Sequence, residues 1–216
     1  MNIFPLPPLN LVVLWSVSFC FLAILIWWKI TIRKRRHLRK QRQARRILEK
    51  IPTLPTFGAK FAYIRKIDPF TFEELLMEGF EAHGFKTIRN KRYTGDGGID
   101  GQVIIDGTRY LIQAKRYRGH ISLQHIRDFD SLLKRHRCRG FFCHTGRTGA
   151  GSKAVSMNSK RLEIISGQRL IDLLTPGSSF TIATGPEAML RRTAATRGTN
   201  SIVEEADKKI DCMRTN

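Results

Sequence analysis

The sequence predicts an α/β domain, a mixed β-sheet flanked by helices, behind an N-terminal transmembrane helix. An uncharged apolar run covers residues 9–28. Strand-like and helix-like patterns then alternate between residues 68 and 175, which is typical of a sheet covered by helices. A glycine-rich turn and a hairpin near residue 100 place an acid, an amide and a lysine close together. These three observations define an anchor, a domain and a candidate site.

The apolar run has the length of a membrane span. About 20 apolar residues match a hydrocarbon core of roughly 30 Å, and Trp15, Trp27 and Trp28 near the ends of the run suit the membrane interface. We therefore predict an anchor over residues 9–30, with residues 1–8 as a short extracytoplasmic end. A cleaved signal peptide is the competing interpretation, but it needs basic residues before the apolar run, and here they follow it.

The positive charge is concentrated after this run. The net charge is +20, and 11 of the 38 Lys and Arg residues lie in residues 29–50. The positive-inside rule places such a cluster, and the chain that follows, in the cytoplasm. The basic segment, residues 31–67, either binds DNA phosphates or acidic lipid headgroups, or only determines topology. Two prolines and a glycine in residues 51–58 predict that it ends in a linker.

The expected domain covers residues 68–175. Asp68 and Pro69 predict an N-cap and first turn of a helix that ends near Gly84. Strands are expected at 85–89, 99–105, 108–115, 140–145 and 162–165, and further helices at 122–135, 150–159 and 168–174. Residues 176–216 are polar and are predicted to form a disordered tail.

The hairpin carries the candidate site. Asp106-Gly107 is a strong hairpin turn, so Asp100 and the end of the strand 108–115 lie toward the same end of the hairpin. Gln113 and Lys115 are two residues apart, and side chains at that spacing share one face of a strand. The pattern predicts an active site made by Asp100, Gln113 and Lys115.

Several stretches carry a resemblance to a known family. They are Phe72-Glu73, Gly95-Asp96-Gly97-Gly98-Ile99-Asp100, Gln113-Ala114-Lys115-Arg116-Tyr117, Thr145-Gly146 and Ile165-Ser166-Gly167. In unbroken order over about residues 68–175, the chain resembles the Mrr-type catalytic domain of the restriction-endonuclease-like PD-(D/E)XK nucleases. Gln113 stands where the wider superfamily has a second carboxylate, and the Mrr-type branch itself carries this substitution.

The resemblance implies metal-dependent cleavage of DNA. It makes Asp100 the principal ligand of Mg²⁺, with the Gln113 amide oxygen or the adjacent backbone as a second ligand and Mn²⁺ as a substitute ion, because hard oxygen donors suit these ions. Lys115 would orient the nucleophile and stabilise the transition state. Glu73, on the first helix of the domain, would hold a metal-bound water.

Other polar residues are candidate DNA contacts or metal ligands. Arg116, Arg118 and Arg127 are expected to bind DNA phosphates without specifying sequence. A zinc site is not expected, because one cluster lacks the spacing of a zinc finger. That cluster consists of His136, Cys138, Cys143 and His144. A homodimer stays open.

The resulting expectation is a membrane-anchored, Mg²⁺-dependent deoxyribonuclease, an endonuclease of type IV-like restriction. It would sit as a single-pass protein in a bacterial inner membrane, with the nuclease domain in the cytoplasm, and would act on foreign or modified DNA. Two alternatives remain open: a non-catalytic, membrane-tethered DNA-binding protein, and a nuclease that cuts junctions in recombination or repair.

Overall fold

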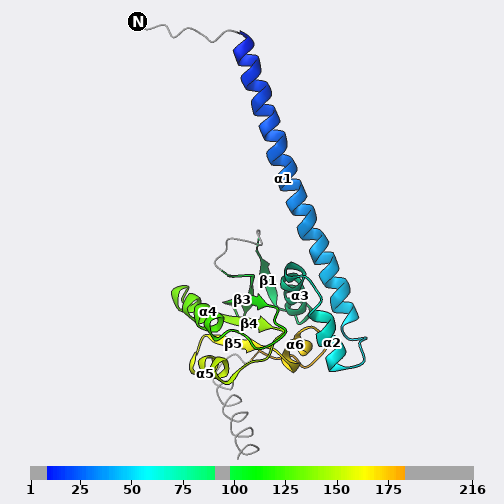
Figure 1. Ribbon diagram of the computed structural model, residues 1–216, viewed down its shortest axis with the longest axis vertical. Coiled ribbons are helices and arrows are strands. Elements are labelled where there is room, and N and C mark those ends of the chain that lie inside the picture. Colours follow the sequence, from blue (N-terminus) through cyan, green and yellow to red (C-terminus); the bar gives the residue numbers. More distant parts are fainter. Residues whose placement is uncertain (1–8, 91–97, 183–216) are drawn as a thin grey trace, which may run out of the picture.

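The computed structural model describes residues 9–90 and 98–182 (Figure 1). The expected extracytoplasmic end, Gly95 and Asp96 of the glycine turn, and the tail from residue 183 lie outside the described residues. The helices are α1 (Leu9–Lys50), α2 (Phe57–Ile64), α3 (Pro69–Ala82), α4 (Leu123–Arg135), α5 (Ala150–Asn158) and α6 (Gln168–Leu173). The strands are β1 (Lys86–Arg89), β2 (Gly101–Ile105), β3 (Thr108–Lys115), β4 (Arg139–His144) and β5 (Leu162–Ile165).

The five strands form one mixed sheet in the order β1-β2-β3-β4-β5. β1, β2 and β3 pair antiparallel, whereas β3, β4 and β5 pair parallel. The predicted α/β class and mixed sheet are thereby confirmed. β3 lies in the middle of the sheet, and its register places Gln113 beside Phe142 and Lys115 beside His144 of β4.

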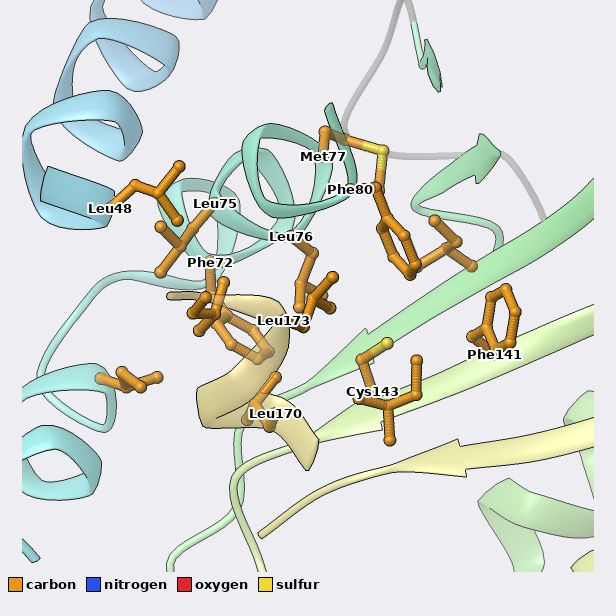
Figure 2. Packing of buried hydrophobic residues seen from close by; sticks show 14 of the residues in the cluster. Leu48, Phe72, Leu75, Leu76, Met77, Phe80, Phe141, Cys143, Leu170 and Leu173 are labelled. Atoms are coloured by element: carbon orange, nitrogen blue, oxygen red, sulfur yellow. The ribbon is translucent and has the colours of Figure 1, made fainter. Parts of the chain in front are cut away.

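Helices cover both faces of the sheet (Figure 1). α3 and α6 pack on one face, where the larger core gathers phenylalanine and leucine side chains of α3 and leucine side chains of α6 around Phe141 and Cys143 of β4 (Figure 2). α4 packs on the other face through Phe129 and Leu133, which contact Phe142 in a second, smaller cluster. Alternate residues of β4 therefore serve two cores, as the period of a strand requires.

The segment expected as a linker is part of the larger core. α1 continues to Lys50, and Ala44, Ile51 and Ile64 are all 0% exposed. The two prolines do lie between α1 and α2, but the glycine, Gly58, lies within α2, which packs beside α6. The folded unit thus begins well before Asp68. At the other end it continues past residue 175, because Phe180 is 9% exposed and packs against Phe80 and His83.

The interface between α1 and α3 contains a cluster of charges. Glu74 and Glu78 of α3 are both buried. Arg89 of β1 bridges α3 and the sheet, since its Nε lies 3.0 Å from Glu74 and its Nη2 lies 2.8 Å from Glu78. From α1, Arg45 binds Glu78 at 3.0 Å and His37 lies 3.2 Å from Glu74. This cluster ties α1, α3 and β1 together.

The first half of α1 leaves the domain as an isolated helix (Figure 1). Its large apolar side chains are exposed, with Trp15 76% and Trp27 68% accessible. Within residues 9–90 and 98–182, the segment Val13–Lys50 is the one helix long and apolar enough to cross a membrane. Its apolar portion is 0% buried, so nothing in the described protein covers it.

Replacing Ile51, the residue that follows α1, by alanine tests whether the C-terminal end of α1 belongs to the folded unit. Ile51 is fully buried in the larger core, so Ile51→Ala should lower the free energy of unfolding by about 2–4 kcal/mol. Chemical denaturation of the detergent-solubilised chain measures this loss. Leu38→Ala, on an exposed position of the same helix, is the matched control and should change stability by less than about 0.5 kcal/mol. Equal, small effects would mean that residues 44–64 do not form part of the core.

Candidate active site

Asp100 is held against the backbone of β3. Its N–H donates to the carbonyl of Ile112 at 2.8 Å, and its Oδ2 accepts from the N–H of Ala114 at 2.7 Å. These two bonds fasten the residue just before β2 to the strand segment that carries Gln113 and Lys115. Asp100 and the two β3 residues therefore meet as the hairpin geometry predicts.

The amide of Gln113 is oriented by the glycine turn. The side chain is 9% exposed, and its Nε2 donates to the carbonyl of Gly98 at 2.9 Å. The carbonyl oxygen of Gly98 can only accept a hydrogen bond, so the NH₂ group of the amide must face it. The other amide atom, Oε1, therefore points away from Gly98. Oε1 is buried without a hydrogen-bond partner among the described residues. An acceptor left in this way ordinarily costs about 1–3 kcal/mol, so it indicates a place for a ligand.

Gly98 is required by this arrangement. Its φ is +88°, a region that disfavours other residues, and a Cβ there would lie 2.7 Å from Nε2 of Gln113. A side chain at this position would therefore push the amide away from the turn. The glycine allows the turn to approach the strand closely enough for the bond to form.

Glu73 of α3 completes the group. Burial raises its pKa to about 8, and the nearby carboxylates of Asp100 and Glu74 add to this rise, while Lys115 opposes it. Burial thus favours the protonated form of Glu73 at pH 7, beside the carboxyl group of Asp100. The four residues predicted to be catalytic come together from α3, the start of β2, and β3.

The donor atoms of this group suit a hard divalent cation. Asp100 supplies a carboxylate, and Gln113 supplies a buried amide oxygen that no described residue satisfies. Mg²⁺ needs only one or two carboxylates besides water and substrate oxygens. The chemistry of these donor atoms is therefore compatible with the expected ion, which the oxygens of Asp100 and Gln113 would hold.

An arginine outside the predicted domain supports the strand end that carries Lys115. Arg65, the C-cap of α2, donates from Nε and Nη2 to the carbonyl of Thr145 at 3.0 and 2.8 Å. The N–H of Thr145 donates to the carbonyl of Lys115 at 3.3 Å, and its Oγ1 accepts from the N–H of Tyr117 at 3.0 Å. Sequence reasoning missed Arg65, because its role depends on how α2 packs and no local pattern marks it.

The histidine beside Lys115 is a buried, neutral residue. Burial lowers the pKa of His144 to about 4, despite an opposing hydrogen bond from Gly146. Nδ1 accepts the N–H of Gly146 at 3.1 Å, so Nε2 carries the proton and donates to Thr148 at 3.1 Å. Cys143, the preceding residue of β4, points to the other face of the sheet and packs in the larger core. Neither nitrogen of His144 is therefore free to bind a metal together with the cysteines.

The three arginines expected to contact DNA differ in their surroundings. Arg118 and Arg127 are exposed. Arg116 is half-buried, and its Nη1 donates to the carbonyl of Arg65 at 3.2 Å, while its Nε is buried without a partner among the described residues. Part of the Arg116 guanidinium is thus used to connect β3 to α2.

Known proteins share sequence with this domain. The restriction endonuclease family model, for Mrr-type catalytic domains, matches residues 64–174. The type IV methyl-directed restriction enzyme EcoKMrr of Escherichia coli (strain K12) is 24% identical over 117 residues, which are 50% of this chain and 38% of that enzyme. The match thus covers well under half of the relative's length. No solved structure shows a significant match.

Alanine at two glycines separates backbone strain from contact with Gln113. Gly98 and Gly107 both have positive φ, but a Cβ at Gly107 meets nothing within 4 Å. Gly107→Ala should lower the unfolding free energy by about 1 kcal/mol through φ alone. Gly98→Ala should lower it by about 1–3 kcal/mol more, because the new methyl group overlaps the Gln113 amide. Denaturation of both variants measures the difference, and equal losses would contradict the close approach.

Proposed function

Because this chain belongs to the restriction endonuclease family, through an Mrr-type catalytic domain, we propose that it is a metal-dependent endonuclease that hydrolyses phosphodiester bonds of DNA. The observation that carries the proposal is the free Oε1 of Gln113, buried beside Asp100 and on the strand of Lys115. A site built only for stability would pair that oxygen. The proposed substrate is foreign or modified DNA, since the relative is described as methyl-directed.

We propose the following roles for the site residues. A divalent cation, when bound, supplies Lewis acidity to the scissile phosphate and lowers the pKa of an attacking water. Asp100 and Gln113 would hold that ion, and Mg²⁺ is our first choice, with Mn²⁺ as a substitute. Lys115 places a positive charge where negative charge develops in the transition state. Glu73, with its raised pKa, holds a water by hydrogen bonding and can exchange a proton with it.

We further propose that exposed arginines position the DNA. Arg118 and Arg127 carry positive charge at the exposed surface. Arginines of this kind bind phosphates irrespective of DNA sequence. Arg116, whose Nη1 connects β3 to α2, is proposed as a third phosphate contact. A homodimer would supply the second cut in a duplex.

We also propose that the apolar half of α1 anchors the enzyme in a bacterial inner membrane, with the domain in the cytoplasm. Its length, its exposed apolar surface and the basic residues that follow it support this location. The anchor confines cleavage to DNA close to the membrane.

A cleavage assay tests the activity. The full chain should cut DNA with Mg²⁺ or Mn²⁺ and stop when the ion is chelated. Lys115→Ala should lower the cleavage rate at least about a hundredfold, because one transition-state contact is lost, and should leave DNA binding nearly unchanged. Arg109→Ala, at an exposed position near the other end of β3, is the matched control and should cut like the parent.

The assay also compares substrates. It includes methylated, unmethylated and four-way-junction DNA, each with and without the ion. Preference for the junction would support a role in recombination. Salt-sensitive binding with no cleavage of any substrate would support the non-catalytic tether and sink the endonuclease proposal.

Fractionation of cells tests the anchor. The parent should stay in the membrane pellet after an alkaline wash, because about 20 apolar residues bind the bilayer core. Leu22→Arg together with Ile26→Arg should move much of the protein to the supernatant, since a charge at the centre of a span costs about 3 kcal/mol. Leu38→Arg, beyond the apolar run, should leave the protein in the pellet. Release of the parent by the wash would refute the anchor.

A further inference from the structure

One face of α1 carries four arginines in a continuous row. Arg35, Arg39, Arg42 and Arg46 follow at spacings of four, three and four residues, which place them on one side of a helix. All four are exposed. Arg39, Arg42 and Arg46 also line one open groove of about 460 Å³, together with Gln43. We call these four residues the arginine row.

The row faces away from the nuclease domain. The opposite side of the helix packs toward α3, with His37, which pairs with Glu74, and the buried Ala44 and Ile47. Gln43, which accepts a hydrogen bond from Thr71 at 3.2 Å, and Arg45 contact α3 from the two flanks of the row. None of the four arginines forms an ion pair within the described part of the chain, whereas Arg45 pairs with Glu78. Four like charges without partners are therefore held at fixed intervals on a rigid helix.

We propose that the arginine row is a second DNA-binding surface, which holds a duplex by its phosphates beside the nuclease domain. The inference rests on the proposed DNA substrate but not on cleavage. Guanidinium groups bind phosphate in a fixed fork geometry. A row of them along about 16 Å of helix can contact several phosphates of one strand without reading sequence.

The geometry of α1 favours DNA over the lipid headgroups. α1 is one continuous helix, so the row cannot lie flat on a membrane that the apolar half crosses (Figure 1). At 1.5 Å per residue, Arg35 lies about 7 Å and Arg46 about 24 Å beyond residue 30. The attraction of an anionic surface fades within a Debye length of about 8 Å. Arg39, Arg42 and Arg46 therefore project past the headgroups into the space where DNA can reach.

The test measures DNA affinity against salt in neutral-lipid nanodiscs, using the full chain with Lys115→Ala to prevent cleavage. Adding Arg35→Gln, Arg39→Gln, Arg42→Gln and Arg46→Gln should reduce the slope of log K against log salt by about three to four. The affinity should fall at least about tenfold at about 0.15 M salt. The matched control neutralises four scattered, exposed cations and should change the slope by less than about one. Its substitutions are Lys86→Gln, Arg109→Gln, Arg135→Gln and Lys160→Gln.

Each outcome decides the proposal. A loss of DNA affinity and of salt slope that is confined to the arginine-row variant supports the proposal. The same loss in nanodiscs rich in anionic lipid supports it as well. An unchanged slope, or an equal loss in the control variant, overturns it. The Lys115→Ala protein and its arginine-row variant could bind DNA equally while only the variant binds anionic vesicles more weakly. That result would identify the row as a lipid-binding surface and would also overturn the proposal. If the parent cuts no DNA yet the row-dependent binding remains, the proposed activity fails and this inference stands.

Discussion

The charge cluster around Arg89 determines where α3 lies, and much of the molecule depends on α3. Glu74 and Glu78 are almost excluded from water, and a carboxylate in that position is costly without a cationic partner. Arg89 reaches both, and it also binds Glu81, whose side chain is partly exposed. Burial alone would raise the pKa of Glu81, but the hydrogen bonds from Arg89 and Thr87 outweigh it and hold that pKa below its usual value.

The cluster has two structural consequences. On one side, Arg45 and His37 share the same carboxylates, so α1 cannot leave α3 without stranding buried charge. On the other side, the placement of α3 brings Glu73, the residue just before Glu74, toward Asp100 and Lys115. The helix that fastens the domain to α1 is thus also the helix that completes the site.

Much of the fold was predictable because its signals are local. β3 was expected at its observed bounds, since Asp106 and Gly107 adopt positive φ in a tight turn that sets the register of the hairpin. The core role of residues 44–64 was not predictable in the same way. The buried positions of α1 stand within a basic block, and the prolines after Ile51 resemble those of a boundary. Only the tertiary partners α3 and α6 distinguish the two cases.

The spatial gathering of the candidate site residues was predictable, but the state of their polar groups was not. The i, i+2 spacing placed Gln113 and Lys115 on one face of a strand. Which atom of the Gln113 amide stays free depends on the carbonyl of Gly98, and no pattern in the sequence specifies that contact. The raised pKa of Glu73 likewise depends on packing. Arg65, which holds the neighbouring strand end, comes from a helix that sequence reasoning placed outside the domain.

The continuity of α1 from its apolar half into the core has a consequence for how the protein meets its substrate. A flexible tether would let the domain reorient freely relative to the membrane. Here the end of α1 is part of the domain core, so there is no flexible joint between the apolar helix and the domain. In a bilayer, the site would then keep one height and one tilt, and could change position only by lateral diffusion of the whole molecule. With the proposed anchor, the encounter with DNA would become a two-dimensional search, in which DNA must enter a thin layer at the height of the site.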